Sequence, residues 1–264
     1  MKAPAFVFPG QGSQFVGMAQ SLYESDPQAR QVIDSADQIL GYKLSDLMFN
    51  GPEEQLKDTA QAQPAILTAS VAVLRVLASR TDIHPAATTG HSLGLFSALV
   101  SAGTLSFEDC LTLVQQRGRL MKETGESNPG SMAAILGLQN DDVADCCRQA
   151  QELTGMPVVA AGYNCPGQCV ISGAEQAVQT AVDLASERAR KATVLDVTIA
   201  AHSPLMDSMR NEFEHYVNSV SFAKPSTPLY SSTTAQPLVN DVAIRKDLIA
   251  QLSYPVRWTE TVSA

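Results

Sequence analysis

The sequence predicts an α/β protein with a largely parallel sheet and a small α+β subdomain inserted into it. Strand, tight turn and helix in succession within the first 122 residues predict the parallel part. A run of elements in the order β-α-β-β-α-β predicts the inserted part. The chain has 264 residues, 45% of them hydrophobic, which is enough for a substantial core in one large domain or two smaller ones.

The parallel part is predicted to begin with a buried strand at 5–8 that ends in Pro9-Gly10. Apolar residues at helical spacing predict a helix over 63–80. A short uncharged strand at 86–89 runs into a glycine-flanked turn, helical spacing resumes at Leu95, and Gly103 ends it. Residues 109–122 are predicted to form another helix.

The inserted part follows from the pattern between residues 127 and 197. We expect strands at 132–136, 157–161, 168–171 and 192–199, with helices at 141–153 and 174–189 and a turn at 164–167. This order is the signature of a ferredoxin-like unit. We therefore expect a ferredoxin-like α+β subdomain at 127–197, inserted into a large catalytic domain formed by 1–126 and 198–264.

Charge and composition exclude several classes of function. Lys and Arg total 18 and Asp and Glu total 27, so the net charge is −9. An acidic chain lacks the basic field that nucleic acid or an anionic membrane needs. No stretch is typical of a membrane span or a signal peptide, so we expect a cytoplasmic protein. The five cysteines are an odd, sparse set without zinc spacing, and we expect free thiols and no metal.

Gly90-His91-Ser92-Leu93-Gly94 matches the G-x-S-x-G nucleophile elbow. The glycines allow a sharp turn from strand to helix, which lifts the serine oxygen clear of the sheet. The N-terminus of the following helix then offers N–H groups and a positive dipole end to an oxyanion. Since a strand is predicted before the motif and a helix after it, Ser92 is the candidate nucleophile of an α/β-hydrolase-like domain.

A serine nucleophile needs a base, and the chain has four histidines. His91 is adjacent to Ser92, so its side chain is expected to point away from it. His84 precedes a proline in a loop, and His215 lies in a polar helical stretch. His202 follows a predicted strand, where α/β enzymes place catalytic groups, although a structural histidine would fit the same position.

Two further features could bind an anion. Pro9-Gly10-Gln11-Gly12 lacks the pattern of a nucleotide-binding loop, but such a turn could offer N–H groups to an oxyanion or be purely structural. Arg117 lies on or beside the apolar face of the helix predicted at 109–122. A desolvated guanidinium needs an anion, either a structural carboxylate or the carboxylate of a substrate.

Together these motifs resemble the malonyl-CoA:acyl-carrier-protein transacylases and the related acyltransferase domains of polyketide synthases. The matching stretches occur in the family's order and span nearly the whole chain. They are Phe8-Pro-Gly-Gln-Gly-Ser-Gln14, Gly90-His-Ser-Leu-Gly94, Arg117-Gly118 with Met121, Met132-Ala-Ala-Ile-Leu-Gly-Leu138, Asn164-Cys-Pro-Gly-Gln168, Val170-Ile-Ser-Gly173, His202-Ser-Pro-Leu-Met206, and Gln251 with Pro255-Val-Arg-Trp258.

The resemblance implies a ping-pong acyl transfer without a cofactor. Ser92 would be acylated by malonyl-CoA, with His202 as its base, and the thiol of an acyl carrier protein would then accept the malonyl group. In this family a backbone carbonyl orients the histidine, and Gln251 matches the position near it. The N–H groups of Gln11 and Leu93 would form the oxyanion hole.

The resemblance also implies a pocket for the acyl group. Arg117 would grip the free carboxylate of malonyl, and an acetyl group would leave that buried charge unpaired. Met121, Asn164, Ala201 and His91 would line the substrate pocket.

Three departures from the family pattern bear on the expected activity. Leu95 stands where the family usually has Glu, and Ala201 stands where it often has Phe. The small side chain of Ala201 would leave room beside the acyl group. The family also normally continues beyond the Pro-Val-Arg-Trp stretch, so the resemblance leads us to expect a truncated C-terminal end. Two alternatives therefore stand beside malonyl transfer: an acyl-thioester hydrolase or broader acyltransferase of a polyketide pathway, and a non-catalytic carrier-docking subunit.

Overall fold

The computed structural model describes residues 3–197 and 199–264. The described residues divide into two compact units. The first holds residues 3–119, 215–231 and 236–245, and the second holds 120–197, 199–214, 232–235 and 246–264. These units differ from the predicted domains, whose boundaries stay a prediction.

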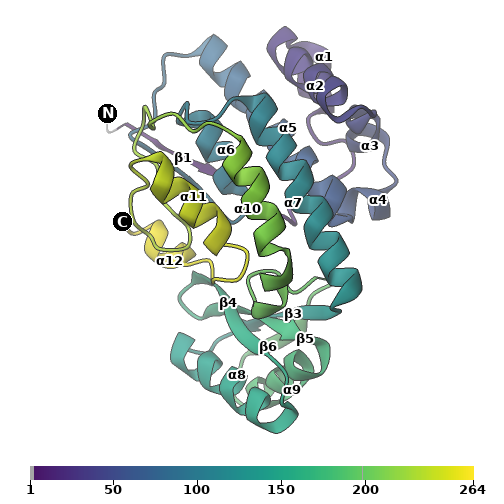
Figure 1. Ribbon diagram of the computed structural model, residues 1–264, viewed down its shortest axis with the longest axis vertical. Helices are drawn as coiled ribbons and strands as arrows, with labels where there is room; N and C mark the ends of the chain where they lie inside the picture. Colours follow the sequence, from purple (N-terminus) through teal and green to yellow (C-terminus); the bar gives the residue numbers. More distant parts are fainter. Residues whose placement is uncertain (1–2, 198) are drawn as a thin grey trace. The chain divides into compact units, whose positions relative to one another are not determined.

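The first unit is mainly helical around a short parallel sheet (Figure 1). The sheet consists of β1 and β2, and helices α1 to α5 lie between them in the sequence. The elements up to residue 101 are β1 (Ala5–Phe8), α1 (Gln20–Ser25), α2 (Pro27–Leu40), α3 (Leu44–Asn50), α4 (Glu53–Lys57), α5 (Thr59–Arg80), β2 (Ala87–Gly90) and α6 (Gly94–Ser101).

A parallel sheet is present, as predicted, and it is formed by β1 and β2. Ala5 lies opposite Ala87, and Phe8 lies opposite Gly90, so both strands end at the same edge of the sheet. A further parallel bridge joins Thr88 to Leu229. Among the described residues, β1 and β2 are the named strands that pair in parallel.

Helix α5 begins four residues before the predicted start at 63. Asp58 explains the difference, because its carboxylate accepts a hydrogen bond from the Ala60 N–H and so caps the helix. By length and composition α5 could cross a membrane, but 56% of its most apolar window is buried inside the protein. That burial is the pattern of a core helix, so the finding is weak evidence for a membrane span.

The second unit contains the elements in the predicted order β-α-β-β-α-β. They are β3 (Gly130–Leu136), α8 (Asn140–Thr154), β4 (Val158–Cys165), β5 (Gln168–Ala174), α9 (Glu175–Ser186) and β6 (Lys191–Val194). The four strands form an antiparallel sheet in the order β4-β5-β3-β6, and α8 and α9 lie side by side against it (Figure 1).

The predicted strand at 192–199 is wrong in length. Strand β6 ends at Val194, where its pairing with β3 also ends, and Thr198 lies outside the described residues. Ile199 and Ala200 are buried without belonging to a strand. Their apolar character reflects this burial, which the sequence pattern could not distinguish from strand pairing.

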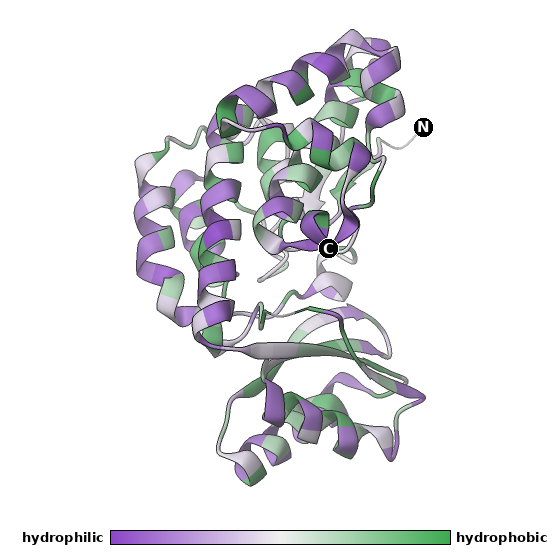
Figure 2. Cartoon of the chain, turned by 90° about the vertical axis from the view of Figure 1, so that its right-hand side faces the viewer, coloured by the Kyte–Doolittle hydropathy of each residue, from purple (hydrophilic) through white to green (hydrophobic). Residues whose placement is uncertain are grey.

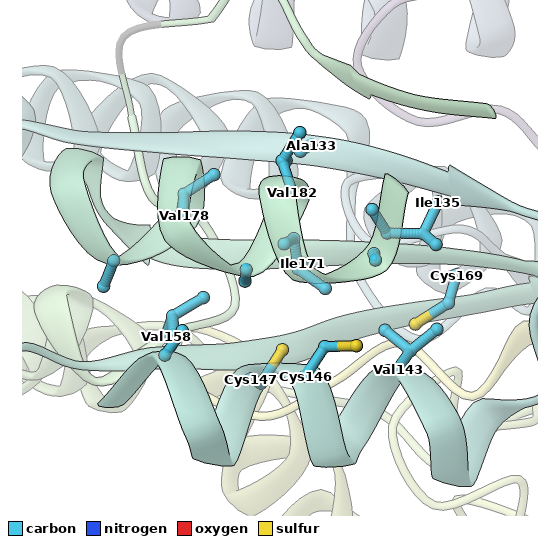
Figure 3. Close-up of a cluster of buried hydrophobic side chains, with 14 of the residues drawn as sticks. Ala133, Ile135, Val143, Cys146, Cys147, Val158, Cys169, Ile171, Val178 and Val182 are labelled. Atoms are coloured by element: carbon cyan, nitrogen blue, oxygen red, sulfur yellow. The ribbon is translucent and has the colours of Figure 1, made fainter. Parts of the chain in front are cut away.

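The core of the second unit lies between its sheet and its two helices (Figure 3). Along β3 buried and half-buried residues alternate, as expected of a strand with one face in a core. Green and purple positions alternate along α8 and α9 in Figure 2, as expected of helices with one apolar face. The core side chains include Ala133, Ile135, Val143, Cys146, Cys147, Val158, Cys169, Ile171, Val178 and Val182.

The remaining elements link the units or lie near the C-terminal end of the sequence. Helices α7, α10 and α11 each run from one unit into the other. The remaining elements are α7 (Phe107–Ser127), a 3₁₀ helix η1 (Pro204–Met209), α10 (Arg210–Ser219), α11 (Asp241–Ala250) and α12 (Trp258–Thr261). All five cysteines are free thiols, as predicted, and four of them are buried.

Candidate active site

The parallel pairing of β1 and β2 brings two glycine-containing turns together in the first unit. The His91 N–H donates to the carbonyl oxygen of Phe8 at 3.0 Å. A Cβ atom on Gly10 would lie 2.5 Å from the carbonyl oxygen of His91, so only glycine fits there. The turn that carries Gln11 therefore packs directly against the turn that carries Ser92.

The turn at Ser92 has the geometry of a nucleophile elbow. A Cβ atom on Gly90 would lie 2.0 Å from the carbonyl carbon of Gly94, and one on Gly94 would lie 2.2 Å from the Phe8 carbonyl oxygen. Ser92 itself has a φ of 51°, a left-handed conformation that is uncommon for a residue with a side chain. Such strain is typical of functional positions, because the surrounding structure must enforce it.

Helix α6 begins directly after this turn. Leu93 is its N-cap residue and is 1% exposed, and the helix from Gly94 to Val100 is buried. The N-terminus of a buried helix carries a partial positive charge, and here the N–H groups of Gly94, Leu95 and Phe96 donate to the carbonyls of His91, Ser92 and Leu93. The elbow thus places the Ser92 hydroxyl beside a site that favours negative charge.

Arg117 is buried in the first unit beside the candidate nucleophile. The side chain lies on α7, is 2% exposed, and donates from Nη2 to Ser92 Oγ at 3.3 Å. From Nη1 it donates to Gln63 Oε1 at 2.6 Å. The guanidinium carbon lies 5.7 Å from the centre of the Phe96 ring, within range of a cation–π contact. Burial lowers the pKa of Arg117 to about 10, because desolvation disfavours the charged form.

A chain of hydrogen bonds connects this arginine to the turn after β1. Gln63 Nε2 donates to Thr59 Oγ1 at 2.9 Å, and the Thr59 hydroxyl donates to Gln11 Oε1 at 3.0 Å. The structure therefore brings together three predicted site residues, Ser92, Arg117 and Gln11. Thr59 and Gln63 were not predicted from the sequence as members of the site.

One signal in the sequence could have found Gln63. It lies between the buried residues Ala62 and Pro64 of α5, and its side chain is fully buried. A polar residue on the buried face of a helix needs a hydrogen-bond partner. That partner is 54 residues away in the sequence, so the pattern alone could not identify it.

His202 lies in the second unit, within a network of backbone carbonyls. Its Nδ1 is 2.6 Å from the carbonyl oxygen of Gln251 and 3.1 Å from that of Tyr254. Because a carbonyl can only accept, the proton lies on Nδ1, and the neutral imidazole carries its lone pair on Nε2. The structure thus brings His202 and Gln251 together, through the backbone of Gln251.

The local backbone also constrains His202. Its φ is 61°, its N–H donates to the Leu252 carbonyl at 3.0 Å, and it is 7% exposed. The prediction that it follows a strand directly is wrong, because β6 ends at Val194 and His202 lies in a turn before η1. Ser203 is the N-cap residue of η1, and its hydroxyl oxygen accepts a hydrogen bond from the Leu205 N–H.

The remaining predicted pocket residues are spread over both units. His91 is half-buried in the elbow of the first unit. In the second unit Met121 is 2% exposed on α7, Ala201 is 8% exposed beside His202, and Asn164 is half-buried in β4. Ser92 and His202 lie in different units, and their pairing stays a prediction.

An apolar cavity lies apart from the predicted site residues. It has a volume of about 470 Å³, lies in the first unit along β1 and α5, and is lined by no predicted site residue. Within residues 3–197 and 199–264, no group of three or more His, Cys, Asp or Glu side chains could hold a metal ion.

Comparison with known proteins identifies a family. The model of the acyl transferase domain family matches residues 5–264. The malonyl CoA-acyl carrier protein transacylase of Bacillus subtilis is 41% identical over 264 residues, covering 100% of this chain and 83% of the relative. The enzyme of the same name from Escherichia coli K12 is 40% identical, covering 98% of this chain and 83% of the relative.

Solved structures agree with this result. A malonyl CoA-acyl carrier protein transacylase from Coxiella burnetii is 37% identical, with a TM-score of 0.96, covering 99% of this chain and 82% of that chain. A malonyl-transacylase in complex with its type II polyketide acyl-carrier protein is 38% identical, also with a TM-score of 0.96, covering 99% and 84%. The chain therefore belongs to the acyl transferase domain family, among the malonyl CoA-acyl carrier protein transacylases.

Proposed function

We propose that this chain transfers a malonyl group from malonyl-CoA to the phosphopantetheine thiol of an acyl carrier protein through a malonyl-serine intermediate. The observation that carries the proposal is the contact between Arg117 and Ser92 Oγ at 3.3 Å. It places a buried cation beside the nucleophile, where the acyl group would be attached. A carboxylated acyl group can pair with that cation, and a plain acyl group cannot.

Ser92 is the proposed nucleophile of the first half-reaction. Its hydroxyl oxygen attacks the thioester carbon of malonyl-CoA, and its proton passes to Nε2 of His202. The N–H groups of Gln11 and Leu93 stabilise the negative oxygen of the tetrahedral intermediate. The C–S bond then breaks, CoA leaves with the proton as a thiol, and malonyl-Ser92 remains.

His202 is the proposed base in both half-reactions. The carbonyls of Gln251 and Tyr254 hold its proton on Nδ1, so the lone pair on Nε2 can take a proton from an attacking group. In the second half-reaction it takes the proton of the carrier thiol. The thiolate attacks malonyl-Ser92, and the serine oxygen leaves with that proton.

The acyl pocket is proposed to combine Arg117 with four further residues. Met121, Asn164, Ala201 and His91 would surround the malonyl group. Ala201 is small, so its departure from the family pattern would leave room for a larger acyl group. The names of the relatives support malonyl transfer over thioester hydrolysis and over a non-catalytic role.

The fold and location complete the proposal. We assign an α/β-hydrolase-like domain to 1–126 and 198–264, because the elbow follows a strand that pairs in parallel. We assign the ferredoxin-like subdomain to 127–197, which the strand order β4-β5-β3-β6 supports. A cytoplasmic location is proposed because malonyl-CoA and carrier proteins are the expected partners.

Transfer to a carrier protein tests this function. The chain is mixed with malonyl-CoA and a holo acyl carrier protein, and the mass of the carrier is followed over time. We expect the carrier to gain one malonyl group in a reaction that requires both Ser92 and the phosphopantetheine arm. Ser92→Ala and the apo carrier are the matched controls. A carrier that stays unmodified while free malonate accumulates would favour the hydrolase.

A further inference from the structure

The buried guanidinium of Arg117 donates a hydrogen bond to the neutral side-chain amide of Gln63. Gln63 is fully buried, and its Oε1 accepts from Arg117 Nη1 at 2.6 Å. Gly118 allows this approach, because a Cβ atom there would lie 2.9 Å from the carbonyl oxygen of Thr59 at the start of α5. Helix α7 at Gly118 therefore packs closely on the start of α5, about one helical turn before Gln63.

The hydrogen-bond chain fixes which way the Gln63 amide points. A guanidinium only donates, so the amide oxygen must face Arg117. The amide nitrogen then faces Thr59 Oγ1 at 2.9 Å, and the Thr59 hydroxyl is directed to Gln11 Oε1. Each group in this chain has one consistent orientation, so Gln63 holds the guanidinium at a defined place beside Ser92.

The charge of the partner decides what Arg117 can bind. A carboxylate at position 63 would form an ion pair with the guanidinium and neutralise it before any substrate arrives. It would also raise the pKa of the arginine, whereas burial here lowers that pKa to about 10. The amide supplies a similar hydrogen bond without a negative charge.

We propose that Gln63 is a specificity-determining residue, whose neutral oxygen positions Arg117 beside Ser92 for the carboxylate of the acyl group. The inference rests on the proposed function and extends it to a residue on another helix. Gln63 acts through Arg117, and it is a positioning residue in this sense. The substitution Gln63→Glu tests it most sharply, because it changes charge and preserves shape.

The experiment compares acylation of Ser92 by malonyl-CoA and by acetyl-CoA. Intact-protein mass after brief mixing gives kcat/KM for each donor. For Gln63→Glu we expect the ratio of malonyl to acetyl kcat/KM to fall by about tenfold or more, since the new carboxylate competes with that of malonyl. The acetyl reaction should be retained or faster, which a general loss of structure would not produce.

Gln116→Glu is the matched control. Gln116 is half-buried on α7, and its Oε1 accepts from Arg119 Nε at 3.0 Å, so the same change of charge falls on a different arginine. We expect the wild-type ratio in this variant. Gln63→Met provides a second test if Gln63→Glu does not fold. It removes the acceptor, and malonyl kcat/KM should fall while acetyl kcat/KM does not.

The outcomes separate the inference from the proposed function. A folded Gln63→Glu with the wild-type ratio would overturn the inference, as would a folded Gln63→Met whose malonyl reaction is unimpaired relative to acetyl. A wild-type chain that takes no malonyl group on Ser92 would instead contradict the proposed function.

Discussion

Replacing Arg117 with alanine should remove most of the preference for a carboxylated acyl group. The guanidinium is 2% exposed and reaches Ser92 Oγ at 3.3 Å, so a malonyl carboxylate bound there would be desolvated. A hydrogen bond to a charged group contributes about 1.5–3 kcal/mol. At about 1.4 kcal/mol for each factor of ten, malonyl kcat/KM should fall by about 10-fold to 150-fold.

The acetyl reaction is the internal reference for this variant. Acetyl has no carboxylate to lose, so its kcat/KM should not fall with Arg117→Ala. The assay is intact-protein mass after brief mixing with each acyl-CoA. Malonylation at the full wild-type rate would refute the reasoning, because Arg117 would then make no contact with the acyl group.

Arg119→Ala is the matched control for loss of a positive charge. Arg119 lies two residues further along α7 and donates to Gln116 and Tyr216 instead of Ser92. Its removal should leave the ratio of malonyl to acetyl acylation unchanged. Stability needs a separate check, because Arg117→Ala also takes a donor from Gln63 Oε1, at a cost of about 1–3 kcal/mol.

Three further predictions concern pH, thiol reactivity and packing. Burial lowers the pKa of Arg117 to about 10, below its usual 12.5, so acylation at increasing pH should show the malonyl preference declining above about pH 10. Between about pH 10 and pH 12.5 the unfolded chain keeps the Arg117 proton that the folded chain has lost. The contribution of Arg117 to the free energy of unfolding should therefore rise with pH in this range, and chemical denaturation checks it. Alkylation at about pH 8 should modify the exposed Cys165 first, because burial raises the pKa of Cys169 to about 12; peptide mapping checks the order. Ile171→Ala should lower the free energy of unfolding by about 2–5 kcal/mol in urea, whereas Leu153→Ala, at a position 71% exposed, should change it by about 0.5 kcal/mol or less.

Much of the second unit could be predicted from the sequence because its signals are local. Alternating apolar residues in β3 and helical spacing in α8 and α9 indicate both the type and the order of the elements. The end of β6 could not be predicted, since apolar residues that fold into a buried turn give the same pattern as a strand. Helices α1 to α4 are absent from the predicted elements, and they are short or connected by tight turns.

The candidate site was predictable in its motifs and not in its connections. The glycines around Ser92 are a strong local signal, and the close approaches at Gly90 and Gly94 give the physical reason for them. The bond from Arg117 to Gln63 joins helices that are distant in the sequence, so it depends on packing. The prediction that a backbone carbonyl orients His202 rested on the family resemblance. The structure has this contact at the Gln251 carbonyl, and the side chains in the sequence do not indicate it.

The most direct test of the central claim is to locate the acyl group on the protein itself. The chain is mixed briefly with malonyl-CoA, its intact mass is measured, and the modified peptide is sequenced by mass spectrometry. We predict one malonyl group, attached to Ser92, absent from Ser92→Ala, and lost when a holo carrier protein is added. A folded chain that takes no malonyl group, or takes it at another residue, would contradict the account.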